Sequence, residues 1–212
     1  MNSLPVLIAA VLGSAMVAAQ APQTGSPPQT SSPQLPKGQM PELGRPTQGT
    51  DQVPLLNFDE YFVGKWTFEW DAPEGVLGPA GKITGTTVYK ALGGAFYEAN
   101  TDATGPAGAF KVKDLIAYQK ENKTVARQVS DTRGFAYLQL ASVGGDLGGL
   151  YNMYFESQPF TFKGKTIRVR DRLTLTSPVA FKVATTVSVD GGPFMNYGNR
   201  WWQKQVPGVT GR

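Results

Sequence analysis

The 212-residue chain contains no histidine and no cysteine. Without these residues it cannot form a Ser-His or Cys-His nucleophile system. It also cannot form a zinc or copper site built on histidine and cysteine, a histidine-ligated haem or a disulfide. Any reaction would have to use carboxylate, lysine, tyrosine or arginine side chains, and we predict no catalytic residue, no metal site and no cofactor.

Long runs of one charge are missing as well. The chain has 20 lysines and arginines against 16 aspartates and glutamates, which gives a formal net charge of +4. The basic residues are spread along the sequence, and no segment has the pattern of a recognition helix. Nucleic acid is therefore not an expected partner.

One apolar run, residues 4–17, lies near the N-terminus. It is too short to be a stable transmembrane anchor, and the small residues of Val17-Ala18-Ala19 follow it. This pattern predicts a signal peptide over residues 1–19 that is cleaved before Gln20, although the usual basic residue ahead of the run is missing. A buried helix is the alternative. We expect a secreted or periplasmic protein with no integral membrane segment after cleavage.

Residues 20–54 are rich in Pro, Gln, Ser, Thr and Gly, and Leu35 and Met40 are among their few large apolar residues. Such a segment cannot bury enough apolar surface to offset the entropy lost on ordering. We expect a disordered linker, either a tether for the domain that follows or a leader with no task of its own. Because cysteine is absent, no lipid can be attached to a cysteine at the mature N-terminus.

The remaining residues, 55–212, alternate between apolar and polar side chains, with breaks at Gly, Pro, Asn and Asp. Period-two alternation between turn signals is typical of short antiparallel strands. Residues 55–63 instead predict a short helix with Asn57 as its N-cap. The expected strands are residues 64–71, 81–91, 95–102, 109–119, 123–131, 134–143, 149–157, 164–176, 179–190 and 194–205.

A meander of about ten strands has two exposed edges unless it closes on itself. The expected fold is therefore all-β, an up-and-down antiparallel barrel over residues 55–212, preceded by the short helix. A two-sheet sandwich is the competing arrangement, because turn spacing does not separate the two. An outer-membrane barrel is less favoured, since the strand around residues 163–176 carries charges where lipid would require apolar residues.

The first strand opens with Gly64-Lys65-Trp66, and Phe68 and Trp70 share the face of Trp66. This resembles the opening motif of lipocalins and related calycin barrels, in which Gly-x-Trp closes the base of the barrel. In that group an arginine from a late strand covers the tryptophan. The resemblance implies that Gly64, Trp66 and Arg200 close the barrel and that Arg200 stacks on Trp66.

The order of further motifs resembles an uncharacterised bacterial family of lipocalin-like barrels, domain of unknown function 1579. The similar segments are Leu92-Gly93-Gly94-Ala95-Phe96 before a strand with Glu98, and then Ile116 and Tyr118 before a lysine-rich turn. The nitrobindins, a neighbouring ten-stranded family, bind haem through a histidine that this chain lacks. The haem of that family is therefore not expected here.

Asp171 is the least expected charge in the predicted strands. In Ile167–Leu175 it shares a face with the apolar residues, whereas Arg168, Arg170 and Arg172 share the other face. An isolated carboxylate inside a barrel costs several kcal/mol, so Asp171 must be paired, hydrogen-bonded or protonated. A buried ion pair is the simpler interpretation, and a ligand or proton-transfer role is the other.

Other polar residues alternate with apolar ones in the same way. Asp114 shares a face with Val112 and Ile116, and Arg127 shares a face with Val125 and Val129. Glu98 shares a face with Phe96 and Asn100. If these side chains converge inside the barrel, they form a polar patch in an apolar cavity, as in many small-ligand sites. If Asp114 and Arg127 point outward, the pocket is apolar. The candidate ligand-binding residues are Glu98, Asp114, Arg127, Asp171, Tyr118 and Trp202.

Three functions fit this pattern. The leading hypothesis is a secreted or periplasmic binding protein that holds a small, largely apolar molecule in its barrel. An isomerase, cyclase or hydratase that uses a carboxylate is the second, and a structural domain of the cell envelope with a solid barrel is the third. An unpaired Asp171 or Glu98 facing a cavity would favour catalysis, and a saturated ion pair would favour binding. The oligomeric state is not predicted.

The signal-peptide hypothesis predicts that the exported protein begins at Gln20. Residues 20–54 should be cleaved readily by protease, whereas a resistant core should start near Leu55, because a disordered segment is open to proteolysis. N-terminal sequencing before and after limited proteolysis tests both statements. A mature protein that still begins at Met1 would contradict the predicted localisation.

Overall fold

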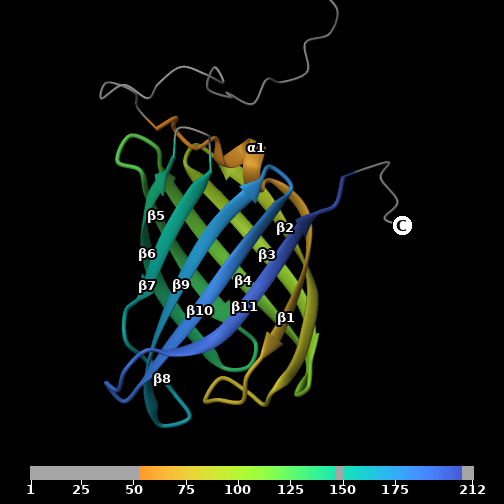
Figure 1. Ribbon diagram of the computed structural model, residues 1–212, viewed down its shortest axis with the longest axis vertical. Helices are drawn as coiled ribbons and strands as arrows, with labels where there is room; N and C mark the ends of the chain where they lie inside the picture. The colour runs from red at the N-terminus through yellow and green to blue at the C-terminus, as the bar shows by residue number, and fades with distance from the viewer. Residues whose placement is uncertain (1–52, 147–149, 207–212) are drawn as a thin grey trace, which may run out of the picture. The chain divides into compact units, whose positions relative to one another are not determined.

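The computed structural model describes residues 53–146 and 150–206, so the expected signal peptide and most of the expected linker lie outside the described residues. Figure 1 shows the described part as a β-barrel with a short helix at one end. Its elements are α1 (Phe58–Phe62), β1 (Gly64–Ala72), β2 (Gly81–Gly93), β3 (Phe96–Gly105), β4 (Gly108–Gln119), β5 (Thr124–Asp131), β6 (Phe135–Gly145), β7 (Tyr151–Ser157), β8 (Phe160–Phe162), β9 (Lys165–Ser177), β10 (Ala180–Val189) and β11 (Met195–Lys204).

The barrel closes through ten antiparallel strands. Each pairs with its neighbour in sequence, except that β7 pairs with β9, and β11 pairs with β1 to close the ring. The all-β barrel prediction is confirmed, and the sandwich alternative is wrong because the β9–β10 and β11–β1 pairings leave no gap between two sheets. The extra strand β8 pairs only with β9, as part of the connection that follows β7.

Local sequence accounts for most of these elements. All ten predicted strands are present, with ends that differ by a few residues from the predicted ones. The Asn57 side chain accepts a hydrogen bond from the Glu60 N–H and caps α1, as expected for an N-cap asparagine. Strand β8 was not predicted, because three residues are too few to show an alternating pattern.

The α1 end of the barrel is filled with side chains. Trp66 is fully buried there, and its Nε1–H donates to the Phe62 carbonyl oxygen at 2.8 Å. The Tyr118 hydroxyl donates to the Leu56 carbonyl oxygen at 3.1 Å, and its ring lies 5.7 Å from the ring of Phe58. These bonds tie the α1 segment to β1 and β4, so this end is closed by packed aromatic residues.

The predicted stacking of Arg200 on Trp66 is wrong. The β1–β11 register places Lys204 opposite Trp66 and Arg200 opposite Trp70. Lys204 Nζ accordingly lies 5.5 Å from the centre of the Trp66 ring, and Arg200 Cζ lies 5.3 Å from the Trp70 ring. Gly64 and Trp66 do lie at the closed end, where a Cβ on Gly64 would meet Lys204 Cε at 3.1 Å. Arg200 belongs to the middle of the barrel.

A bulge in β11 directs Arg200 inward. The β10–β11 register shifts between Ala184 and Thr186, opposite the segment that contains Gly198. Gly198 has φ +89°, and a Cβ on it would lie 2.6 Å from Trp70 Nε1, which itself donates to the Tyr197 carbonyl oxygen. The extra residue puts both Tyr197 and Arg200 on the inner side of the strand, which strict alternation would not allow.

We predict that Gly198→Ala destabilises the protein by about 1–3 kcal/mol more than Gly191→Ala. Both glycines have positive φ, +89° and +78°, but a Cβ on Gly191 would meet nothing within 4 Å. The control therefore carries the backbone strain without the clash against Trp70. Urea unfolding of the two variants measures the difference. Equal losses of stability would contradict the close approach of β11 to Trp70.

Candidate functional site

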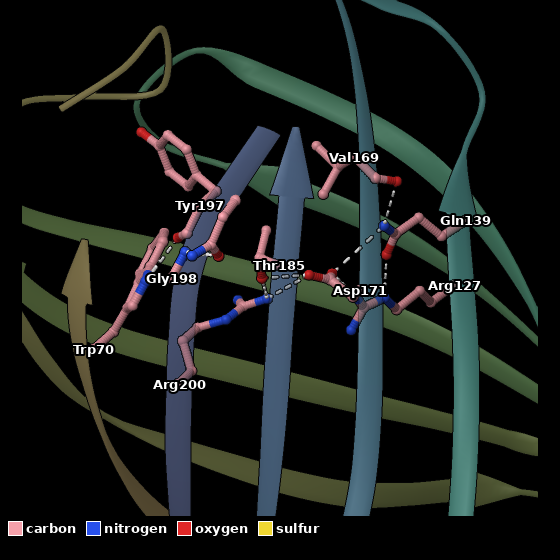
Figure 2. Close-up of polar contacts among 10 residues, drawn as sticks. Trp70, Arg127, Gln139, Val169, Asp171, Thr185, Tyr197, Gly198 and Arg200 are labelled. Atoms are coloured by element: carbon pink, nitrogen blue, oxygen red, sulfur yellow. Dashed lines mark hydrogen bonds and ion pairs between the residues drawn. The ribbon is translucent and has the colours of Figure 1, made fainter. Parts of the chain in front are cut away.

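Asp171, in the middle of β9, is the centre of a buried polar network. Its side chain is 1% exposed. One carboxylate oxygen, Oδ1, accepts hydrogen bonds from Thr185 Oγ1 at 2.6 Å and from Arg200 Nη2 at 2.8 Å. Figure 2 shows these side chains converging from β9, β10 and β11. The Arg200 guanidinium also donates to Thr185 Oγ1 at 3.0 Å, so the three groups form a closed triangle.

The other oxygen, Oδ2, faces β5 and β6. It accepts from Arg127 Nη2 at 2.5 Å and, at a longer 3.5 Å, from Gln139 Nε2 (Figure 2). The Gln139 Oε1 atom in turn accepts from Arg127 Nε at 2.6 Å. The Arg127 guanidinium lies 4.3 Å above the ring of Phe155. Asp171 therefore joins four strands through one carboxylate, and both of its oxygens are fully used.

The charge of Asp171 is stabilised by its partners. Burial alone would raise its pKa, but the guanidiniums of Arg200 and Arg127 and the hydrogen bonds from Thr185 and Gln139 outweigh burial and lower the pKa below its usual value. Asp171 is thus the ionised half of a saturated ion pair rather than a free acid. This agrees with the simpler of the two interpretations drawn from the sequence.

A cavity of about 100 Å³ lies beside this network, between the middle of the barrel and the end opposite α1. Its wall combines apolar and aromatic side chains with polar ones, which come from strands all around the barrel. Trp202 contributes its indole, stacked between the rings of Phe68 at 4.5 Å and Phe181 at 5.2 Å. The polar and aromatic lining residues are Thr101, Asp114, Arg127, Thr185, Arg200, Tyr89, Tyr137 and Trp202.

The end opposite α1 is covered by a stacked arginine. Arg133 follows β5 and pairs with Asp131 at 2.6 Å, and its guanidinium lies 3.9 Å above the ring of Phe110. Leu77, from the connection between β1 and β2, lies beside them in the cavity wall. The Arg133 guanidinium is thus held by one carboxylate and by the aromatic faces of Phe110 and Phe135. It covers the cavity at this end, whereas packed aromatic residues close the α1 end.

Three residues that line the cavity each have a buried polar atom with no hydrogen-bond partner among the described residues: Asp114 Oδ1, Arg200 Nε and Trp202 Nε1. Such atoms are rare in native proteins, because a buried polar group without a partner costs about 1–3 kcal/mol. Three of them around one cavity indicate a place for a hydrogen-bonding guest.

Asp114 and the two cavity phenols are held toward their neutral forms. Burial raises the pKa of Asp114, and the charges of Arg127 and Arg200 only partly oppose this effect. Burial also raises the pKa of Tyr89 and of Tyr137 well above the usual value. Both phenols therefore stay protonated near neutral pH and can donate hydrogen bonds.

The structure places four of the six candidate residues in or next to the cavity. Asp114, Arg127 and Trp202 line it, and Asp171 lies behind Arg127 and Arg200. The alternative that pointed Asp114 and Arg127 outward is wrong, since both lie on the inner face as their apolar neighbours do.

Glu98 and Tyr118 do not reach the cavity. Glu98 lies on the outer face of β3, where it pairs with Lys113 at 2.6 Å, because the buried residues of this strand are its neighbours Tyr97 and Ala99. The grouping of Glu98 with inner residues was therefore wrong. Tyr118 points inward but belongs to the α1 end, where its hydroxyl binds the Leu56 carbonyl.

Sequence reasoning missed the inner role of Arg200 and the phenols of Tyr89 and Tyr137. Tyr89 could have been found by alternation, since it falls on the same face of β2 as Ile83 and Thr87. Arg200 shares a face with Trp202 by alternation, but the resemblance placed it at the end of the barrel, over Trp66, whereas the structure places it opposite Trp70. The arginines 168, 170 and 172 lie on the outer face as expected, and the first two pair with Glu156.

Within residues 53–146 and 150–206, no group of three or more carboxylates is placed to hold a metal ion. In the same part of the chain, no helix is long and apolar enough to cross a membrane.

Comparison with known proteins gives the fold and no family. No protein-family model matches the chain, and no curated protein matches it. A crystal structure of Rv2717c from M. tuberculosis superimposes with a TM-score of 0.60 at 10% identity, over 74% of this chain and 100% of that one. A de novo designed fluorescence-activating β-barrel gives a TM-score of 0.42 at 13% identity, over 71% of this chain and 100% of the design. The first similarity supports the barrel fold alone.

We predict that Asp171→Asn destabilises the protein by about 3–5 kcal/mol at pH 7, because two buried guanidiniums lose their carboxylate. Asp190→Asn is the control: this carboxylate pairs with Lys165 at 2.9 Å but is 47% exposed, and its loss should change the stability far less. Asp171 has a lowered pKa, so its stabilising effect is present above the unfolded-state pKa of about 3.9 and is lost as the pH falls through the folded-state value. Thermal unfolding from pH 7 to pH 2 measures both effects. Similar losses in the two variants would show that Asp171 is not a buried ionised partner.

Proposed function

We propose that the barrel is a binding protein that holds one small, largely apolar ligand with a polar head in its inner cavity. The observation that carries this proposal is the cavity itself, which has apolar and aromatic side chains in its wall and three lining residues, on β4 and β11, with an unpartnered polar atom. Apolar walls with a few convergent polar groups are the usual composition of a small-molecule site.

The state of Asp171 supports binding over catalysis. Both of its oxygens are occupied by Thr185, Arg200 and Arg127, so it has no free lone pair directed at a substrate. Glu98 lies outside the barrel and cannot act on a bound molecule. The structural-domain alternative requires a solid interior, and a cavity of about 100 Å³ argues against it.

The size of the cavity limits the ligand. Drug-sized ligands occupy roughly 300–1,000 Å³, and a cavity of about 150 Å³ accommodates benzene. A volume of about 100 Å³ is smaller than that and therefore suits a molecule of a few heavy atoms. Long fatty acids, isoprenoids and polyketides exceed the space between these walls.

We also propose that the protein binds its ligand outside the cytoplasm and belongs with the uncharacterised lipocalin-like barrels that it resembles. The apolar run at residues 4–17 and the motifs around Trp66 and Phe96 support these two statements. N-terminal sequencing tests the first of them.

Binding should be visible through Trp202. We predict that a small ligand from a panel of propionamide, propionate, benzamide and benzoate changes tryptophan emission saturably. The same ligand should raise the melting temperature, by the equivalent of about 2.7 kcal/mol at 100 times its Kd. Stacked Trp202 lines the cavity, so Trp202→Phe should remove most of the emission change.

Trp201→Phe is the matched control, because Trp201 is 58% exposed on the outer face and should leave the signal unchanged. Val112→Phe should fill the cavity and abolish binding while the barrel stays folded. If no compound gives a saturable signal or a thermal shift, the binding proposal fails and a structural role becomes the better account.

A further inference from the structure

We propose that the ligand is a small organic monocarboxylate, whose carboxylate is held by Arg200 and Trp202 and faces an Asp114 that carries a proton. This inference rests on the proposed binding function and specifies its ligand class. Three observations support it: the kind of hydrogen bond that each unpartnered atom can make, the net charge of the residues around the cavity, and the apolar side chains in the cavity wall.

The unpartnered atoms on β11 require an acceptor. Arg200 Nε–H and Trp202 Nε1–H are donors that cannot accept, and neither has a partner among the described residues. The two residues are next-but-one neighbours on the inner face of β11, so their side chains point to the same part of the cavity. A group with two acceptor oxygens satisfies both donors at once, as a carboxylate does.

The charges around the cavity favour an anion. Asp171 neutralises only one of its two arginine partners, Arg127 and Arg200. Arg133, at the covered end, is already paired with Asp131. One positive charge is therefore left over unless Asp114 is ionised. A monoanion balances this charge, whereas a dianion such as hydrogen phosphate would overcompensate it.

Asp114 completes the site as a hydrogen-bond donor. Its Oδ1 has no partner among the described residues, and a carboxylate bound beside it would share the site with it. Two carboxylates in one site hold a proton between them, because both cannot stay ionised at short range. Burial already raises the pKa of Asp114. The charged and titratable groups that face it are Arg127, Arg200, Asp171, Asp131, Tyr89 and Tyr137.

The apolar side chains of the cavity wall favour an organic acid over an inorganic anion as the ligand. Phe68, Phe181 and Val183 line the cavity together with the polar groups. A hydrocarbon part placed against them gains stability from leaving water, at about 25 cal/mol per Å² of apolar surface buried. Chloride or nitrate has no such part, so a carboxylate with a short hydrocarbon chain fits the wall better.

Isothermal titration calorimetry of the full mature chain tests the inference with matched pairs, propionate against propionamide and benzoate against benzamide. Titrations between pH 5.5 and 9, in low-chloride buffers of different ionisation enthalpy, also count the protons taken up. We expect the acid of at least one pair to bind at least tenfold more tightly than its amide. Proton uptake should rise toward one per ligand as the pH rises, and affinity should then fall by up to tenfold per pH unit.

Two variants identify the groups involved. Asp114→Asn imitates the protonated acid, so it should keep the preference for the acid, and both the proton uptake and the pH dependence should disappear. Trp202→Phe removes one donor without touching Asp171 and should weaken acid binding about tenfold, which is typical of a hydrogen bond to a charged group. Trp201→Phe, on the outer face, should change neither quantity.

Three other results of the titrations would contradict the inference or the proposed function. If an amide binds as tightly as its acid, the inference falls and the binding function stands. If the acid binds without proton uptake up to pH 9, or with the same uptake in Asp114→Asn, the proton is not on Asp114. If neither member of either pair binds, both the inference and the proposed function fail.

Discussion

A carboxylate buried inside a barrel has to be neutralised by groups that are buried with it, and Asp171 meets this requirement through two arginines from different strands. Arg127 reaches it from β5 and Arg200 from β11, with Thr185 and Gln139 completing its hydrogen bonds. Because each partner comes from another strand, the network fixes how these strands lie around the interior. It also brings two positive charges and one negative charge into the interior, and this excess favours an anionic guest in the adjacent cavity.

The two ends of the barrel differ for physical reasons that follow from their residues. At the α1 end, Trp66 and Tyr118 donate hydrogen bonds to carbonyl groups of the α1 segment, and the ring of Phe58 packs against those of Phe62 and Tyr118. At the other end, Arg133 and Leu77 cover a cavity with unpartnered polar atoms in its wall. Such atoms reduce the stability of the empty barrel. A guest that satisfies them would recover that loss, which is the usual balance between stability and function at a binding site.

Much of the fold could be predicted from the sequence. The strands, the closed barrel and the inward position of Asp171 all follow from period-two alternation and turn residues. The cavity could be predicted only in part. Alternation correctly places Asp114 and Arg127 on the inner face, but two other residues were placed wrongly. Glu98 was misplaced because Phe96, at the edge of β3, is exposed and so gave a false inner face. The level of Arg200 in the barrel, opposite Trp70 rather than Trp66, depends on the β1–β11 register, a pairing of residues far apart in the sequence.

The central claim is that the unpartnered donors in the cavity wall are the ligand-binding groups. The ¹H–¹⁵N spectrum tests it directly, because the chain has four tryptophans and each indole N–H has a different environment. Trp66 and Trp70 donate to backbone carbonyls, Trp201 is exposed on the outer face, and Trp202 Nε1 has no partner among the described residues. On titration with propionate or benzoate, the account predicts that the Trp202 indole and Arg200 Nε–H signals shift together and saturate, while the Trp201 signal stays in place. A saturating shift confined to Trp201, or unchanged Trp202 and Arg200 signals throughout the titration, would contradict it.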